Sequence, residues 1–254
     1  AHVLRMPRLK LYLSFDRELT EAELATLREL VMRRGNREPL QHLVGTVSFC
    51  GYEIAVNRDV FIPRPETELL AEQCWIWLDQ SGIESPAVLD VGTGSGCVAI
   101  ALALRCPAAR LTAVDISEAA LVVARSNAAR HGVEDRITFV CGDAFSAISK
   151  GTRFDLIVSN PPYIPTEEIS RLQPEVRDYD PRIALDGGAD GLGFIRRLAV
   201  EAADYISPEG RLMIEFGDGQ AELVRGIFGS AGWNVEDVKV DDHGCPRILV
   251  ARRC

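Results

Sequence analysis

The alternation of short apolar segments with longer amphipathic segments after residue 87 constrains the fold of this chain most strongly. Short apolar segments predict buried strands, and the segments between them predict the right-handed crossover helices that build a parallel sheet. The last two apolar segments are separated only by residues 241–246, which leaves no room for a crossover helix, so we expect an antiparallel hairpin there. The predicted strands are residues 87–91, 110–114, 137–140, 154–158, 210–216, 233–240 and 247–251, and the predicted helices lie near residues 95–105, 117–131, 189–206 and 218–231. The chain is therefore predicted to be an α/β protein with a mostly parallel, seven-stranded sheet that ends in an antiparallel hairpin.

The segment before residue 63 predicts two smaller units. Residues 1–40 read as helical, because Thr20 and Glu23 form a capping-box pattern and apolar residues then recur at helical spacing as far as Gly35. Residues 44–60 alternate with a period of two, which predicts a β-hairpin. The chain begins at Ala1 inside the expected helical segment, so we expect a truncated or disordered amino terminus. The expected divisions are a helical domain at residues 1–42, which acts as a scaffold or docks a partner, a hairpin connector at 43–62 and the main domain at 63–254.

Composition argues against several classes of protein. The net charge of −9 provides no broad basic surface for a phosphate backbone, which disfavours tight nonspecific binding of nucleic acid. The seven cysteines lack Cys-x-x-Cys spacing and the four histidines form no ligand pair, so we expect no metal site. No apolar run approaches the roughly 18 residues of a membrane span. We expect a monomer in a reducing compartment, which is the cytoplasm or, if a transit peptide preceded the chain, an organellar matrix.

A buried strand is predicted to end just before Asn160. The apolar residues 154–158 lead into Ser159-Asn160-Pro161-Pro162-Tyr163, and two consecutive prolines can neither continue a strand ladder nor start a helix. Because ligands of open α/β sheets bind at the carboxyl ends of the strands, we interpret Asn160 as a site residue; an ordinary Asn-Pro turn is the alternative. The long polar loop that follows, residues 164–188, is predicted to form a lid or a substrate collar.

A second group of candidate residues lies upstream, where the strand at residues 87–91 runs into a glycine turn. The glycines at positions 92, 94 and 96 let the backbone turn tightly before a helix whose free N–H groups face a ligand. Asp115 ends the next strand about 20 residues further on, where a carboxylate can accept both ribose hydroxyls. Asp143 follows the third strand and is expected to accept from the adenine amine, while Ala144 lines the ring pocket. Each aspartate alone is better explained as a cap or turn residue, but together these groups predict an adenosine carrier without a pyrophosphate, and S-adenosylmethionine fits.

A methyl donor beside Asn160 suggests methylation of a planar nitrogen. Amide and aniline-like nitrogens are poor nucleophiles because their lone pair is delocalised. If the side-chain oxygen of Asn160 and the carbonyl of Pro161 hold both hydrogens, the nitrogen can turn its lone pair toward the methyl group while Tyr163 packs on the flat face. Catalysis would then come from positioning and electrostatic preorganisation, with proton loss after methyl transfer.

Four segments carry motifs that occur together in one known family. They are Asp-Val-Gly-Thr-Gly-Ser-Gly at residues 90–96, Asn-Pro-Pro-Tyr at 160–163, Phe-Ile-Pro-Arg-Pro-Glu-Thr-Glu at 61–68 and Asp-Gly-Gly-Ala-Asp-Gly-Leu at 186–192. Together they resemble the peptide chain release factor glutamine N5-methyltransferases, over nearly the whole chain. The resemblance implies a class I S-adenosylmethionine-dependent methyltransferase fold of the Rossmann-like type. It also implies methyl transfer from S-adenosylmethionine, with S-adenosylhomocysteine as product, to the glutamine of the Gly-Gly-Gln loop of class I release factors.

The same resemblance implies roles for individual residues. The implied catalytic residues are Asn160, Pro161 and Tyr163, and the implied substrate-binding residues are these three with Pro162 and Phe61, the aromatic that closes the site. The implied cofactor-binding residues are Gly92, Thr93, Gly94, Ser95, Gly96, Asp115, Asp143, Ala144 and Asn160. Two departures stand out. Ala144 replaces a bulky aromatic of some relatives, with Phe145 as the candidate to compensate, and the amino-terminal domain is shorter than in the family.

Several interpretations remain open from the sequence. Asn-Pro-Pro-Tyr also occurs in adenine-N6 methyltransferases that act on DNA or RNA, although the net charge of −9 and the lack of a basic target-recognition domain disfavour that function. The Gly-x-Gly-x-Gly spacing disfavours an NAD(P)-dependent oxidoreductase, and the presence of every predicted site group disfavours a non-catalytic adaptor. Glu215, at a strand end, is predicted either to anchor the glycine turn through backbone N–H groups or to be solvated. Residues 65–68 are predicted to be a plain helix start.

Overall fold

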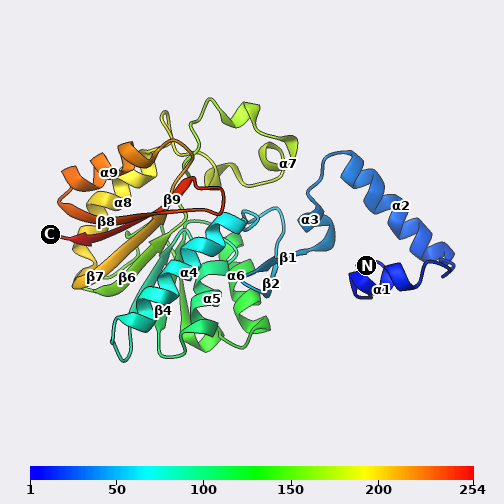
Figure 1. Cartoon of the computed structure of the whole chain (residues 1–254), viewed down its shortest axis with the longest axis horizontal. Coiled ribbons are helices and arrows are strands. Elements are labelled where there is room, and N and C mark those ends of the chain that lie inside the picture. The colour runs from blue at the N-terminus through cyan, green and yellow to red at the C-terminus, as the bar shows by residue number, and fades with distance from the viewer.

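A seven-stranded sheet forms the centre of the computed structural model, which describes residues 1–254 (Figure 1). The strands follow the order β5-β4-β3-β6-β7-β9-β8, and neighbours are parallel except for the two pairs that involve β9. The predicted sheet with its antiparallel hairpin is confirmed. The strands are β3 (Ala87–Val91), β4 (Arg110–Asp115), β5 (Ile137–Cys141), β6 (Phe154–Ser159), β7 (Ile206–Glu215), β8 (Trp233–Val240) and β9 (Pro246–Arg253).

The start of β7 is where the strand prediction differs most from the structure. β7 begins at Ile206 rather than at residue 210, because Ile206 already pairs with Phe154 before a register shift in the ladder. Pro208 and Gly210 interrupt the apolar pattern within this part of the strand. The early part of β7 therefore lacks the periodicity from which a strand is predicted.

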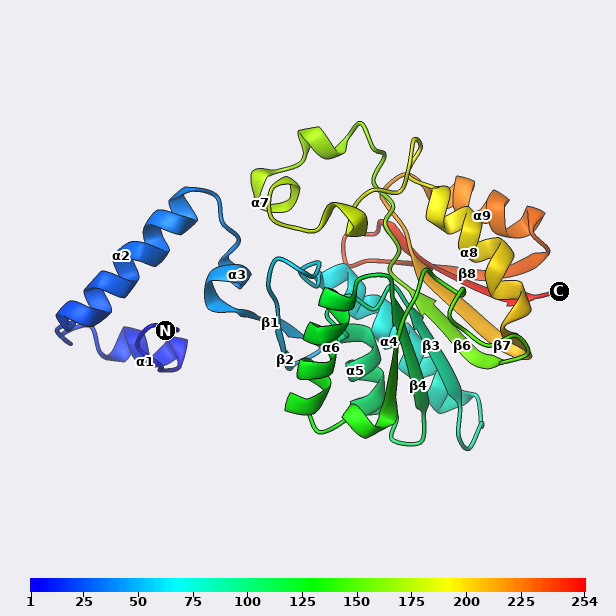
Figure 2. The same ribbon diagram turned by 180° about the vertical axis from the view of Figure 1, so that it is seen from behind.

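Helices cover both faces of the sheet. On one face lie α4 (Pro65–Gln80), α5 (Cys97–Arg105) and α6 (Glu118–Arg130), and on the other lie α8 (Gly193–Glu201) and α9 (Ala221–Ser230) (Figures 1 and 2). Because side chains alternate along a strand, β3 places Val88 in one buried cluster and Leu89 in the other. Burial on both faces explains why the strands read as nearly continuous apolar runs. No helix of the chain combines the length and apolar character that crossing a membrane requires.

The amino-terminal helices are α1 (Arg8–Leu13), α2 (Glu21–Gly35) and α3 (Leu40–Val44). The predicted capping box is confirmed, since the Thr20 hydroxyl accepts from the Glu23 N–H while the Glu23 carboxylate accepts from the Thr20 N–H. The expectation that Ala1 lies in a helix is wrong, because the first helix begins only at Arg8. No residue of α1 or α2 is buried, and both helices project from the sheet domain (Figure 1).

A two-stranded hairpin connects these helices to the sheet domain. β1 (Thr46–Phe49) and β2 (Tyr52–Ala55) pair antiparallel, so the predicted hairpin is confirmed but shorter than residues 44–60. The buried side chain of Asn127 in α6 joins β2 to the glycine turn. Its Oδ1 accepts from the Ala55 N–H at 2.8 Å, and its Nδ2 donates to the carbonyls of Ala55 at 3.0 Å and Ser95 at 2.9 Å.

The segment that we call the collar, residues 164–188, is folded rather than irregular. It contains α7 (Pro174–Arg177) and two single 3₁₀ turns, and a bridge between Ile164 and Asp186 closes its base. The carboxylate of Glu175 accepts from Arg34 at 2.9 Å and from Arg37 at 2.6 Å, which attaches the collar to the end of α2. The collar therefore lies between the amino-terminal helices and the sheet domain (Figure 2).

We expect Asn127→Ala to destabilise the protein by roughly 2–4 kcal/mol, because it removes the partner of backbone groups of the half-buried Ala55 and the buried Ser95. Urea unfolding followed by circular dichroism measures the change. Ser126→Ala on the same helix, at an exposed position, is the control and should change stability by less than about 0.5 kcal/mol. Equal stability of the two variants would show that Asn127 does not hold the hairpin.

Candidate active site

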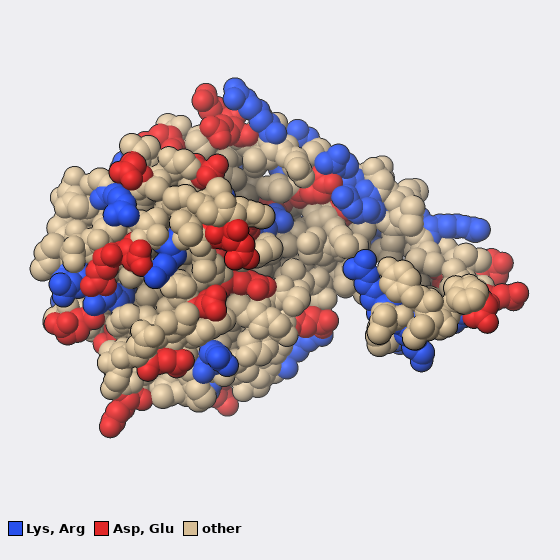
Figure 3. Space-filling view, in the orientation of Figure 1, with Lys and Arg blue, Asp and Glu red and all other residues tan.

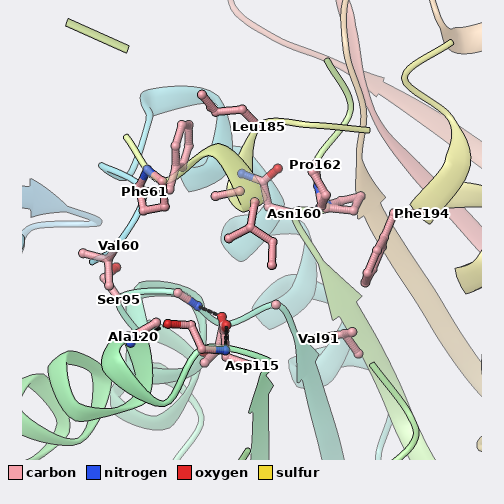
Figure 4. Close-up of a pocket in the computed structure, with 18 of the residues that line it drawn as sticks. Val60, Phe61, Val91, Ser95, Asp115, Ala120, Asn160, Pro162, Leu185 and Phe194 are labelled. Carbon is pink, nitrogen blue, oxygen red and sulfur yellow. Dashed lines mark hydrogen bonds between the residues drawn. The ribbon is translucent and has the colours of Figure 1, made fainter. Parts of the chain in front are cut away.

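A cavity of about 600 Å³ opens at the carboxyl ends of β3, β4 and β6. In Figure 4, Asp115 and Ser95 lie on one side of the cavity, whereas Asn160 and Phe61 lie on the opposite side. The collar contributes apolar lining residues, among them Leu185. Every predicted site residue except Gly96 lines this cavity.

The glycine turn has the backbone geometry of a ligand cradle. Gly92 and Gly94 have φ values of +76° and +55°, which residues with a side chain rarely adopt, and a Cβ added at either position would meet only open space. The buried Ser95 hydroxyl also has no hydrogen-bond partner in the chain. Gly96 has a different role, because a Cβ there would lie 3.1 Å from the Cβ of Ala124, so this glycine allows α5 and α6 to pack closely. The turn fits a ligand that approaches the backbone directly.

Asp115 fixes the position of the glycine turn. Its Oδ2 accepts from the Gly94 N–H at 2.8 Å and its Oδ1 accepts from the Ser117 N–H at 2.9 Å. Burial raises the pKa of this carboxyl group, and the backbone hydrogen bonds oppose that shift. Each carboxylate oxygen retains acceptor capacity toward the cavity, so the predicted contact with two hydroxyl groups is compatible with the geometry.

The far end of the cavity contains an ion pair and an aromatic ring that the sequence did not predict. Asp143 is ion-paired with Arg197 of α8, which also donates to the Asp143 carbonyl at 3.1 Å. The proposed compensation by Phe145 is wrong, because Phe145 is buried away from the cavity and stacks on Tyr205 with a centroid distance of 5.0 Å. Phe194 of α8 is the aromatic residue that lines the cavity beside Pro162 (Figure 4).

The amide of Asn160 is held by a chain of hydrogen bonds. Its Nδ2 donates to the hydroxyl of Thr67 at 3.0 Å, and this hydroxyl donates to Oε2 of Glu215 at 2.8 Å. Oε1 of Glu215 accepts from the Tyr163 hydroxyl at 3.2 Å. No group of the chain donates to Oδ1 of Asn160, which leaves this oxygen available as an acceptor.

Both predicted alternatives for Glu215 are wrong. The residue is 1% exposed, so it is not solvated, and its partners are the side chains of Thr67 and Tyr163 rather than the glycine turn. Burial raises the pKa of Glu215 to about 7, although the two hydroxyl donors oppose this shift. Burial and the adjacent carboxylate also raise the pKa of Tyr163, so its hydroxyl remains protonated.

The elements around Asn160 position the other predicted residues. The hydroxyl of Ser159 donates to the Val91 carbonyl at 2.7 Å, which holds the end of β6 against β3. Pro161 is buried and follows directly. The ring of Phe61 lies under the guanidinium of Arg64 at 4.8 Å, and Arg64 is paired with Asp180 of the collar at 2.7 Å. The collar thereby contacts the wall that contains Phe61.

Four residues that line the cavity were not predicted as site residues from the sequence. Thr67 was part of an expected helix start, but it is buried in the first turn of α4 and its hydroxyl contacts Glu215 and Asn160. Phe194 and Arg197 come from α8 and carry no local motif. Asp90, which precedes the glycine turn, is buried and accepts from the Thr93 hydroxyl at 2.7 Å.

The chain is similar to known proteins over most of its length. Residues 1–45 match the family described as "PrmC N-terminal domain", and residues 67–172 match "Methyltransferase small domain". A release factor glutamine methyltransferase of Geobacter sulfurreducens is 46% identical over 98% of this chain and 85% of its own length. One of Chlorobaculum tepidum is 48% identical over 92% of this chain and 82% of its own length. The crystal structure of a methyltransferase from Pyrococcus furiosus has the same fold, with a TM-score of 0.58, 19% identity, and coverage of 92% of this chain and 99% of that chain.

The stability of the protein should depend on the titration of Asp90. Burial raises the pKa of Asp90 to about 7, so between about pH 4 and pH 7 the folded protein keeps a proton that the unfolded chain releases. Folding stability from this group therefore falls as the pH rises through that window. The unfolding free energy of the wild type minus that of Asp90→Asn should decrease by about 2–4 kcal/mol from pH 4 to pH 7, measured by urea denaturation. A constant difference would contradict the raised pKa.

Proposed function

Because the chain belongs to the release factor glutamine methyltransferase family, we propose that it methylates the side-chain amide nitrogen of the glutamine in the Gly-Gly-Gln motif of class I peptide chain release factors. The proposed methyl donor is S-adenosylmethionine, which supplies an electrophilic methyl group on its sulfonium and leaves as S-adenosylhomocysteine. The seven cysteines are all free thiols, in agreement with a reducing compartment such as the one in which translation takes place.

The hydrogen bond from Asn160 to Thr67 is the observation that carries this proposal. Because Nδ2 of Asn160 is already bound, the amide offers its oxygen to a ligand in the cavity. A glutamine amide has two hydrogens, and the Asn160 oxygen and the Pro161 carbonyl are the proposed acceptors. Fixed acceptors hold the amide nitrogen so that its lone pair is directed at the methyl group. Positioning and preorganised dipoles then promote the transfer, and no strong base is needed.

The cofactor is proposed to lie along the opposite side of the cavity. There the glycine turn leaves open space beside Gly92 and Gly94, Asp115 offers acceptors for ribose hydroxyls, and Asp143 with Ala144 borders the proposed adenine position. Phe194 supplies the aromatic surface that Ala144 lacks. Asn160 lies across the cavity from Asp115 (Figure 4), so the methionine end of the cofactor would have to face Asn160.

The remaining predicted residues are proposed to hold the glutamine chain. Phe61 closes the wall beside Asn160, and Pro162 and Tyr163 border the path of the amide. Because the Tyr163 hydroxyl donates to Glu215, its ring has a fixed orientation. Proton loss from the methylated nitrogen follows transfer, when that nitrogen has become acidic, so no strong base is required.

Methylation of adenine in nucleic acid is the rival function that uses the same chemistry. On the face in Figure 3, acidic and basic side chains are interspersed and no broad basic area appears, which fits the net charge of −9. Both features give little attraction for a phosphate backbone.

A methyl-transfer assay separates the two functions. The purified chain is incubated with S-adenosylmethionine labelled in the methyl group and with a release factor, a capped Gly-Gly-Gln peptide, a matched Gly-Gly-Glu peptide, DNA or RNA. We expect label in the release factor and the glutamine peptide only. Label in nucleic acid and none in the release factor would overturn the proposed function.

Asn160→Ala should lower the rate of methyl transfer by about 10²-fold or more, because it removes a preorganised acceptor. The dissociation constant for S-adenosylmethionine, measured by calorimetry, should change only a few-fold. Asn234→Ala, at an exposed position on β8, is the control for a change of the same type. Equal loss of binding and turnover would make Asn160 a cofactor-binding or folding residue.

Asp115→Asn should weaken S-adenosylmethionine binding by roughly 10-fold or more, because it replaces the charged acceptor proposed for the ribose hydroxyls, which also holds the Gly94 N–H. Calorimetry gives the affinity, and Asp135→Asn at an exposed site is the matched control. Wild-type affinity in Asp115→Asn would exclude the proposed ribose contact.

A further inference from the structure

We propose that Thr67 and Glu215 are positioning residues, which set the direction of a hydrogen-bond chain and thereby keep the oxygen of Asn160 turned toward the substrate amide. This inference rests on the proposed function, since it assigns the parts that orient Asn160. The three residues come from separate elements: Thr67 from the first turn of α4, Asn160 from the end of β6 and Glu215 from the end of β7.

The number of donors and acceptors determines the direction of each hydrogen bond between Glu215, Thr67 and Asn160. An ionised carboxylate only accepts, so the single proton of the Thr67 hydroxyl must go to Glu215, at 2.8 Å. The Thr67 oxygen is then left to accept, and the group that meets it at 3.0 Å must be a donor, the NH₂ of Asn160. The oxygen of Asn160 consequently points away from Thr67. The carboxylate thus determines the orientation of an amide that it does not touch.

A neutral Glu215 would remove this preference. A protonated carboxyl group can donate to Thr67, whose own proton is then free to be donated to the oxygen of Asn160. The Asn160 amide would rotate and present its NH₂ group to the substrate. Two donors, the NH₂ groups of Asn160 and of the substrate amide, would then face each other. The reversed chain cannot hold a substrate NH₂ group, so transfer should require the ionised form of Glu215.

The surroundings of Glu215 allow the switch between these forms at neutral pH. Burial, with a smaller contribution from Glu66, raises the pKa of Glu215 to about 7, against the opposing effects of the Thr67 and Tyr163 hydroxyl groups and of Arg247. Asp90 also lines the cavity and has a pKa raised to about 7, so it titrates in the same range. Variants of the two carboxylates distinguish their contributions.

Thr67 offers a matched pair of variants. Thr67→Val keeps the shape of the side chain but removes the hydroxyl, so Asn160 loses its acceptor; we expect kcat to fall about 10- to 100-fold. The KM for a capped Gly-Gly-Gln peptide and the calorimetric Kd for S-adenosylmethionine should stay within a few-fold. Thr67→Ser restores the hydroxyl and should restore kcat to within a few-fold. Wild-type kcat in a folded Thr67→Val, or equal loss in both variants, would overturn the proposal.

The dependence of kcat on pH tests the proposed role of Glu215. In the wild type, kcat should rise with pH through about 7, as Glu215 ionises. Glu215→Gln can take either orientation toward Thr67, so its kcat should be about ten-fold lower and should lose this rise, whereas Asp90→Asn should retain it. A rise that persists in Glu215→Gln but disappears in Asp90→Asn would overturn the role of Glu215.

The side-chain amide signals of Asn160 in ¹⁵N NMR report the state of the hydrogen-bond chain and do not require turnover. We expect these signals to titrate near pH 7 in the wild type and to be flat in Glu215→Gln. A wild type that shows the titration but does not methylate the peptide would contradict the proposed function and leave the hydrogen-bond chain intact. An active wild type with no titration of these signals would contradict the hydrogen-bond chain alone.

Discussion

The hydroxyl of Thr67 joins three elements that are far apart in the sequence, and the geometry of the site depends on it. It accepts from Asn160 at the end of β6 and donates to Glu215 at the end of β7. A buried carboxylate without partners is strongly unfavourable, so the fold must bring donors to Glu215. Thr67 and Tyr163 are those donors, and satisfying the carboxylate also fixes Asn160. The stability requirement of one buried charge and the orientation of the candidate catalytic amide therefore have the same physical cause.

The sheet order makes this meeting possible. β6 lies between β3 and β7, so the glycine turn, Asn160 and Glu215 end at the same edge. The collar closes the cavity above that edge, and it is held from two directions: Arg64 pairs with Asp180, and Arg34 and Arg37 pair with Glu175. The amino-terminal helices are thus in direct contact with the segment that covers the cavity.

Local sequence patterns predicted the parts of the structure that depend on local chemistry. Strand periodicity predicted the sheet, and the two prolines predicted that Asn160 follows a strand end. The glycines predicted the turn at residues 92–94, where Gly92 and Gly94 have positive φ values. Patterns failed where the outcome depends on distant partners. Nothing near Glu215 indicates that Thr67 will reach it, and nothing near Phe145 indicates that it will stack on Tyr205 while Phe194 lines the cavity. The fold was largely predictable, whereas the contacts that orient the site required the three-dimensional arrangement.

A crystal structure with S-adenosylhomocysteine and a Gly-Gly-Gln peptide tests the central claim most directly. The account predicts that the glutamine amide nitrogen lies within hydrogen-bond distance of the Asn160 oxygen and the Pro161 carbonyl, in line with the cofactor sulfur. It also predicts that the Asn160 NH₂ still donates to Thr67. A glutamine amide bound elsewhere in the cavity, or an Asn160 whose NH₂ faces the peptide, would contradict the account.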